Sequence, residues 1–251
     1  MSPLPILFIH GFPLDRTMWR HQIAAPALSP WKCIAPDLRG FGALSARAPS
    51  NGWSMAGYAD DLIQVLDSLK IREAVVCGLS MGGYILFELL RRHSSRVRAA
   101  ILCNTKAAAD SPDAKRDRDA MAALAQRAGA TAVAVQLLPK LLARATLAAE
   151  PQVAAEVREI IQRAPVPGIV GALHALRDRA DSTPLLGSIR VPVLVVAGDD
   201  DQIAPAAGME EMARAIPHAR FVCIPKAGHL TPFEQPNATN MVLADFVAGL
   251  R

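Results

Sequence analysis

The stretch Ala74-Val75-Val76-Cys77-Gly78-Leu79-Ser80-Met81-Gly82-Gly83 places a serine between glycines, directly after an apolar run. A Gly-x-Ser-x-Gly pattern arises by chance in about one chain in ten of this length, so it needs support from its context. The run before it is short and β-branched, and Tyr84–Arg92 after it is rich in helix formers and ends on two cations. Between a strand and a helix, such a tight turn lifts a serine hydroxyl clear of the sheet. The stretch therefore predicts a nucleophile at Ser80.

Continuous apolar runs recur along the chain and predict strands that are buried on both faces. The runs are Leu4–Ile9, Ala74–Cys77, Ala99–Cys103, Val191–Ala197 and Arg220–Ile224, with Lys32–Ala35 as a weaker sixth. Segments of helical length lie between them, such as Ala56–Leu69, which has an apolar stripe. This alternation predicts an α/β fold with a mostly parallel sheet flanked by helices on both sides.

The interval between Cys103 and Val191 breaks this alternation, because it contains no run that resembles a strand. Apolar stripes at helical spacing occur instead over Ala130–Leu142, Val153–Ile161 and Ile169–Leu176. We predict a helical cap over residues 107–186, inserted into an α/β core formed by residues 1–106 and 187–251. The alternative is that these helices simply cover the sheet.

Composition narrows the function classes. The chain has 251 residues, of which 51% are hydrophobic, so it can bury one sizeable core. Its net charge of +4 comes mostly from cations interleaved with acids, as in Lys115-Arg116-Asp117-Arg118-Asp119, which argues against nucleic acid as a partner. No apolar segment has the length of a membrane span, and the first residues lack the features of a secretory signal. We expect a cytoplasmic protein that does not bind a membrane.

A serine hydroxyl needs a base to take its proton, and the base needs a carboxylate to orient it. The apolar run Val193–Ala197 leads into Asp199-Asp200-Asp201, and the run Phe221–Pro225 leads to His229. The order serine, aspartate, histidine is that of nucleophiles on strand-to-helix turns. A metal site made by the three aspartates is the rival interpretation. Adjacent residues of an extended chain point in alternating directions, so we expect no metal.

Further motifs carry a family resemblance. They are His10-Gly11-Phe12-Pro13, Pro36-Asp37-Leu38-Arg39-Gly40-Phe41-Gly42, the glycine-flanked Ser80, the aspartate run and Ala227-Gly228-His229-Leu230. Together they span nearly the whole predicted core. The chain resembles the α/β-hydrolase superfamily, in particular its capped esterase and lactonase branch.

The resemblance implies roles for individual residues. Similar proteins place the catalytic acid three residues past the glycine that ends its strand, which selects Asp201 over Asp199 and Asp200. It also implies an oxyanion hole made by the backbone amides of Met81 and Phe12. The counterpart of His10 orients its loop in such proteins. No metal or organic cofactor is implied.

The predicted activity is the hydrolysis of carboxylic esters with small to medium apolar acyl groups, through an acyl-enzyme at Ser80. A 3-oxoadipate enol-lactonase-like hydrolase is the alternative, and its carboxylate-bearing substrate requires a cation such as Arg39, Arg144 or Arg177. A third reading is a non-hydrolytic member of the fold that binds a ligand. The partner that we expect is a small-molecule ester or lactone.

Similar proteins commonly begin with an antiparallel hairpin, whereas the first predicted strand of this chain starts almost at Met1. We therefore expect a sheet without this hairpin, with an edge near Lys32–Ala35. Because an uncovered edge pairs readily with another chain, a homodimer or a covering loop is expected there.

Overall fold

The structure is a computed structural model, and it describes residues 4–47 and 52–250. Six strands form one sheet in the order β2-β1-β3-β4-β5-β6, and all neighbouring strands are parallel. The strands are β1 (Ile6–Ile9), β2 (Cys33–Ile34), β3 (Ala74–Leu79), β4 (Val97–Cys103), β5 (Val193–Gly198) and β6 (Arg220–Ile224). All six predicted runs thus form strands. The described residues contribute no antiparallel strand to this sheet.

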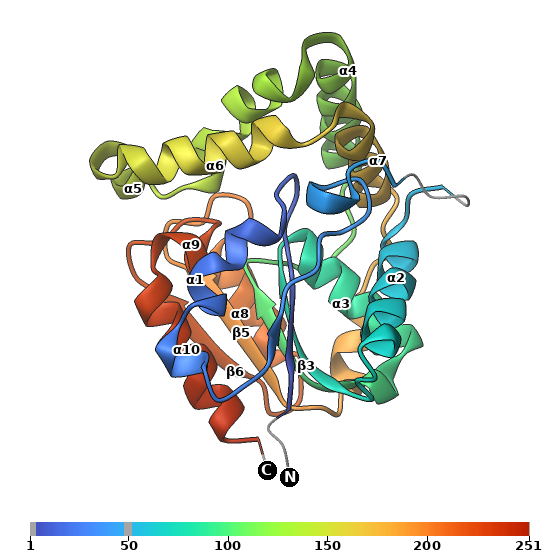
Figure 1. The fold of residues 1–251 in the computed structure, drawn as a ribbon, viewed down its shortest axis with the longest axis vertical. Helices are drawn as coiled ribbons and strands as arrows, with labels where there is room; N and C mark the ends of the chain where they lie inside the picture. Colours follow the sequence, from blue (N-terminus) through green and yellow to red (C-terminus); the bar gives the residue numbers. More distant parts are fainter. Residues whose placement is uncertain (1–3, 48–51, 251) are drawn as a thin grey trace.

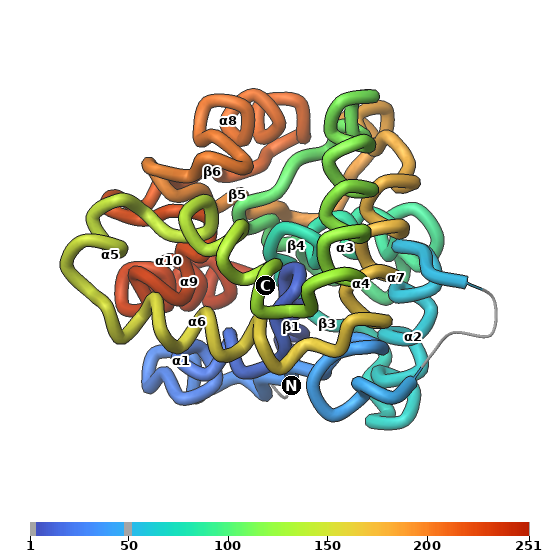
Figure 2. The backbone as a smooth tube through the Cα atoms, turned by 90° about the horizontal axis from the view of Figure 1, so that it is seen from above, coloured from blue at the N-terminus to red at the C-terminus, as the bar shows by residue number. Residues whose placement is uncertain are grey.

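Helices cover both faces of the sheet (Figures 1 and 2). The helices α2 (Met55–Ser68), α3 (Met81–Arg92) and α8 (Ala206–Arg214) lie on one face, and α1 (Arg20–Ile23) and α10 (Pro236–Ala248) lie on the other. The short helix α9 (Thr231–Glu234) precedes α10. Because both faces are covered, β1, β3 and β5 are fully buried, which explains their continuous apolar sequences.

The edge strand β6 differs from this pattern. Its residues range from exposed to buried, so the prediction that Arg220–Ile224 is buried on both faces is wrong. The physical reason is its place at the end of the sheet, where it has one neighbouring strand, β5. The other edge is β2, as predicted, and its two residues are half-buried.

Four helices of the long insertion lie together beyond the carboxyl ends of the strands (Figure 1). They are α4 (Pro112–Leu141), α5 (Arg144–Ala149), α6 (Pro151–Arg163) and α7 (Val166–Arg177). The stripe residues Val157, Ile160 and Ile161 of α6 are buried, because α6 packs on α4 and α5. This helical insertion occupies the position of a cap.

Helix α4 is longer than the predicted segment Ala130–Leu142. By length and composition alone it reaches the dimensions of a membrane-spanning helix. Gly129 interrupts its helical geometry with φ 74°, and the helix packs on α6 and α7. Ser111 begins α4, with its hydroxyl accepting a hydrogen bond from the amide of Ala114 (3.2 Å).

The first and last segments of the insertion, residues 107–110 and 179–182, are here called its stems. They meet where the insertion leaves and rejoins the core. The amide of Ser182 donates to the carbonyl of Ala107 (2.9 Å). The buried Arg179 pairs with the buried Asp110 (2.7 Å), which also contacts Arg118 of α4 (3.0 Å). Burial raises the pKa of the Asp110 carboxyl, but the charges of Arg118 and Arg179 outweigh this and hold the pKa below its usual range.

Candidate active site

Ser80 lies at the turn between β3 and α3, with φ 53° and ψ −111°. A non-glycine residue with this geometry is strained and persists where its surroundings hold it. The amide of Ser80 donates to the carbonyl of Cys103 (2.9 Å), and its carbonyl accepts a hydrogen bond from the Thr105 hydroxyl (2.9 Å). The turn is therefore tied to the end of the neighbouring strand β4.

The glycines around Ser80 permit close packing of this turn. A Cβ atom on Gly78 would collide with the carbonyl oxygen of Gly82, and one on Gly82 would collide with the carbonyl oxygen of Ile9. The first collision is between β3 and α3, which flank the turn. The second is between α3 and β1. A side chain at either position would push α3 away from the sheet and displace Ser80.

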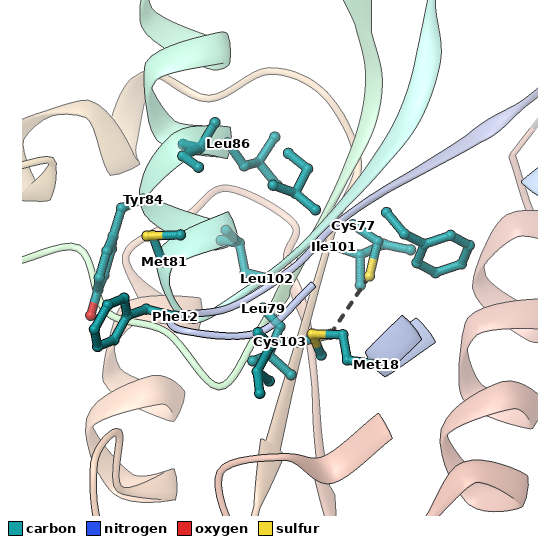
Figure 3. Packing of buried hydrophobic residues seen from close by; sticks show 14 of the residues in the cluster. Phe12, Met18, Cys77, Leu79, Met81, Tyr84, Leu86, Ile101, Leu102 and Cys103 are labelled. Atoms are coloured by element: carbon teal, nitrogen blue, oxygen red, sulfur yellow. Dashed lines mark hydrogen bonds between the residues drawn. The ribbon is translucent and has the colours of Figure 1, made fainter. Parts of the chain in front are cut away.

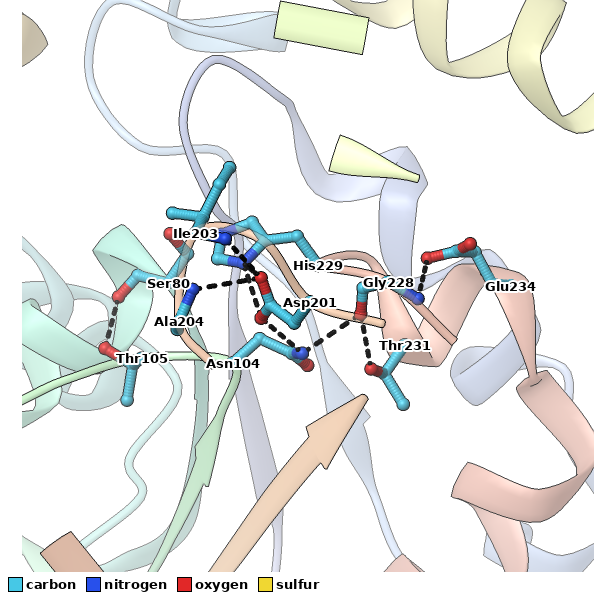
Figure 4. A network of polar contacts seen from close by, with 10 residues as sticks. All are labelled: Ser80, Asn104, Thr105, Asp201, Ile203, Ala204, Gly228, His229, Thr231 and Glu234. Atoms are coloured by element: carbon cyan, nitrogen blue, oxygen red, sulfur yellow. Dashed lines mark hydrogen bonds and ion pairs between the residues drawn. The ribbon is translucent and has the colours of Figure 1, made fainter. Parts of the chain in front are cut away.

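His229 and Asp201 are in direct contact at the ends of β6 and β5. The Nδ1 atom of His229 lies 3.0 Å from Oδ1 and 2.9 Å from Oδ2 of Asp201, and both residues are buried (Figure 4). The other two aspartates of the run have different partners. Asp199 accepts a hydrogen bond from the amide of Ala227 (3.2 Å), and Asp200 pairs with Arg144 (3.0 Å). Of the three, Asp201 is the one that contacts the imidazole.

Three further donors hold the Asp201 carboxylate (Figure 4). Oδ1 accepts hydrogen bonds from the amides of Ile203 (2.8 Å) and Ala204 (3.0 Å), and Oδ2 accepts one from Nδ2 of Asn104 (2.9 Å). Burial alone would raise the pKa of Asp201. The charge and hydrogen bond of His229, with the bonds from Ala204 and Asn104, outweigh burial and lower the pKa. The carboxylate is thus kept ionised beside the imidazole.

Ser80 is the third residue of the predicted catalytic set, and it lies at the same end of the sheet as Asp201 and His229. Asn104 lies between Cys103 and Thr105, which both bind the backbone of Ser80, and its side chain contacts Asp201. The hydrogen bonds within the described residues do not include one between Ser80 Oγ and His229. The arrangement joins Asp201 to His229 directly and to the serine turn through the end of β4. Hydrogen bonds to a nucleophile often tighten only when substrate is bound.

The predicted oxyanion-hole residues lie beside this turn. A Cβ atom on Gly11 would lie 3.6 Å from Cβ of Ser80, which places the loop after β1 against the serine. Figure 3 shows Phe12, Met81 and Tyr84 near one another. Within the described chain, the amides of Phe12 and Met81 donate to no protein acceptor. Two free amides, one at a helix N-terminus, are suited to bind a negatively charged oxygen.

His10 orients the loop that follows β1. Its Nδ1 donates to the carbonyl of Gly11 (3.0 Å), and its Nε2 accepts a hydrogen bond from the amide of Leu38 (3.0 Å). Burial lowers the pKa of His10, against the opposing effect of the Gly11 hydrogen bond. A neutral imidazole with both nitrogens bonded to backbone orients the loop that carries Phe12, and no nitrogen is left for a substrate.

Three residues that support the site were not predicted from the sequence. Asn104 and Thr105 directly follow a buried strand, and this position is their only signal in the sequence. Glu234 gave no local signal. Its buried carboxylate accepts hydrogen bonds from the amides of Gly228 (2.8 Å) and Ala143 (2.7 Å) and from the hydroxyl of Thr146 (2.7 Å).

These bonds connect the cap to the loops that carry Asp201 and His229. Glu234 joins the loop of His229 to the segment that begins α5, and the amide of Leu230 donates to the carbonyl of Leu141 (3.1 Å). Arg144 holds Asp200, the neighbour of Asp201, through its amide (2.8 Å) and its guanidinium. The segment 141–146 therefore contacts both the acid loop and the histidine loop.

A family model for the alpha/beta hydrolase fold matches residues 5–236 of this chain. The chain is an α/β hydrolase. A thermophilic esterase from Thermogutta terrifontis is 39% identical, with a TM-score of 0.95 over 99% of this chain and 91% of that one. The enol-lactonase from Burkholderia xenovorans is 31% identical, with a TM-score of 0.86 over 98% of this hydrolase and 92% of that chain.

Another relative of the hydrolase carries a different name. The putative non-heme bromoperoxidase BpoC of Mycobacterium tuberculosis is 30% identical over 98% of this chain and 95% of its own length. The relatives thus share one fold and bear names of several activities. Membership in the hydrolase family is established by these comparisons, and the choice among substrates depends on the site itself.

Proposed function

We propose that this hydrolase is a serine carboxylesterase that forms an acyl-enzyme at Ser80. The observation that carries the proposal is the buried contact between Asp201 and His229, at the sheet end where the strained turn presents Ser80. An imidazole held by a carboxylate through Nδ1 has Nε2 available as a base, which is what a serine nucleophile requires.

In the proposed reaction, Nε2 of His229 takes the proton of Ser80 Oγ as this oxygen attacks the acyl carbon. The amides of Phe12 and Met81 stabilise the oxyanion, and Asp201 stabilises the imidazolium. His229 then protonates the departing alcohol, which leaves the acyl group bonded to Ser80. Water attacks this ester by the same route and releases the carboxylic acid.

A lactonase acting on a carboxylate-bearing lactone is the second candidate, supported by the similarity to the enol-lactonase. The cations that the sequence analysis offered for such a substrate already have partners. Arg39 contacts Asp61, Arg144 contacts Asp200, and Arg177 contacts Asp119 and Asp178. These pairings favour an uncharged acyl group, and with it the esterase.

The first test replaces the nucleophile. We expect Ser80→Ala to reduce kcat for ester hydrolysis on the order of 10⁶-fold, because no other group forms the acyl-enzyme. The readouts are turnover of a chromogenic ester, thermal unfolding to show an intact fold, and labelling by a fluorophosphonate. A wild-type protein that resists the label at Ser80 would favour the ligand-binding alternative.

The second test compares substrates. Aliphatic esters of increasing acyl length, neutral lactones and lactones with a free carboxylate are offered at equal concentrations. The esterase proposal expects the highest kcat/KM with uncharged esters. A preference for the anionic lactones would assign the chain to the lactonase class instead.

A further inference from the structure

A cavity lies next to the proposed site but apart from its reacting groups. It has a volume of about 380 Å³ and lies between the segment after β4 and helix α8. This volume is within the range of sites for small ligands. Within the described chain, its walls include neither Ser80 nor His229, and neither Phe12 nor Met81.

The cavity has mostly apolar walls and one cation. Apolar side chains come from η5 (Thr183–Ser188) and from α8, among them Leu186, Met209 and Met212, which are buried. Lys106 is the cation, and it is half-buried. Glu211 also lines the cavity and is exposed.

Lys106 has no ion-pair partner within the described residues, unlike the arginines near it. Arg179 and Arg118 both pair with Asp110. Burial lowers the pKa of Lys106 and the charge of Arg179 lowers it further, while the charges of Asp110 and Asp201 oppose this shift. Asp110 is already paired with Arg118 and Arg179, and Asp201 contacts His229, so an anion from outside the protein would give the half-buried ammonium a direct partner.

We propose that this cavity binds a small amphipathic carboxylate, with the carboxylate on the Lys106 ammonium and the aliphatic chain along Leu186, Met209 and Met212. Charge complementarity fixes the polar end of the ligand. The apolar walls fix the other end, because burying an alkyl chain against them removes apolar surface from water. The site is separate from Ser80 and His229, the reacting groups of the proposed function.

The cavity is connected to the proposed catalytic acid through its own walls. Ile203 and Ala204 line it, and their amides are the donors to Oδ1 of Asp201. Thr105 lines it as well, and its hydroxyl binds the carbonyl of Ser80. A ligand in the cavity therefore changes turnover without occupying the place of the substrate.

Binding is measured by calorimetry with octanoate, and with octanamide as a neutral ligand of equal length. The protein carries Ser80→Ala, so that the result does not depend on turnover. We expect octanoate to bind, and Lys106→Met to weaken it at least about tenfold, the loss of one charge-assisted hydrogen bond. The matched control Lys140→Met, on the exposed face of α4, should bind as the parent does.

A second variant fills the cavity. Gly208 of α8 lines it, and a Cβ atom there would meet nothing within 4 Å, so Gly208→Phe should fold and block the aliphatic part. We expect this variant to lose octanoate binding, and its ester hydrolysis should no longer respond to octanoate. Equal binding of octanoate by the parent, Lys106→Met and Gly208→Phe would overturn the proposal.

Steady-state kinetics of the wild-type enzyme locate the ligand. Octanoate should change kcat, and its effect should persist at saturating ester. If octanoate inhibits purely competitively, and Lys106→Met leaves this inhibition unaltered, octanoate binds where the ester does. That result would overturn the proposed separate site. If Ser80 proves not to be a nucleophile, the calorimetric result still stands, so the two proposals fail separately.

Discussion

The amide side chain of Asn104 acts as a support for the proposed catalytic acid. Its Nδ2 atom donates to Asp201 (2.9 Å) and to the carbonyl of Gly228 (3.2 Å), so it contacts both the acid loop and the histidine loop. Asn104 is fully buried and has φ 46°, a left-handed conformation that asparagine tolerates better than most residues. It holds the geometry of the pair formed by Asp201 and His229.

Replacing this residue tests its role. We expect Asn104→Leu to lower kcat about tenfold to a hundredfold with little change in KM, because one hydrogen bond to a charged group contributes about 1.5–3 kcal/mol. The variant is measured by ester kinetics beside Asn237→Leu, an exposed control on α10. An unchanged kcat in a folded Asn104→Leu protein would contradict the role.

The strands were predicted well from the sequence because their burial is recorded in continuous apolar runs. The prediction failed where burial depends on position in the sheet, as at β6. Likewise, the loops that carry Asp201 and His229 follow recognisable strands, and the structure brings these two side chains together. Asn104 and Glu234 could not be predicted, because their significance arises from donors that lie far away in the sequence.

Glu234 attaches the segment that begins α5 to the loop of His229. Burial raises the pKa of this carboxyl, and the bonds from Thr146, Ala143 and Gly228 oppose the shift. A carboxyl with a raised pKa in the folded state contributes most to stability below its ordinary value of 4.5, and this contribution is lost as pH rises through the folded pKa.

We therefore expect the free energy of unfolding of the wild type, relative to Glu234→Gln, to fall as pH increases from below 4.5 through this window. Urea unfolding at a series of pH values measures the difference. Hydrogen exchange of α5 should also be faster in Glu234→Gln, because glutamine presents an N–H₂ group to donors. A difference that does not vary with pH would contradict the assignment of the raised pKa.

The ion pairs at the stems hold the cap on the core. Asp110 lies before α4 and Arg179 lies after α7, and both are buried. Breaking a buried pair leaves an uncompensated charge, so we expect Asp110→Asn to lower the free energy of unfolding by about 3 kcal/mol at neutral pH. Urea unfolding measures this change.

The sign of the pH dependence follows from the lowered pKa of Asp110. Its contribution is present above the ordinary value of 3.8 and is lost as pH falls through the lower folded pKa, so wild type and variant should converge in acid. The control is Asp113→Asn, which removes an exposed pair with Arg116 and should change stability by less than about 1 kcal/mol. Equal effects of the two substitutions would refute the role of the stem pair.

Association of two copies through the β2 edge stays a prediction. The edge strand has two residues, and a very short edge is a poor template for pairing. Sedimentation at several protein concentrations distinguishes the expected homodimer from a covered edge. A single monomeric species, with the amides of Cys33 and Ile34 protected from exchange, would contradict pairing.

The meeting of the two stems has a consequence for engineering. Since the carbonyl of Ala107 and the amide of Ser182 are within hydrogen-bond distance, the chain leaves and re-enters the core at one point. Exchanging the helical insertion is therefore geometrically simple. An insertion from another protein can be grafted between Ala107 and Ser182 if its two ends lie next to each other. A graft that omits segment 141–146 also removes its contacts with the loops of Asp201 and His229, so the new segment must supply contacts that replace them.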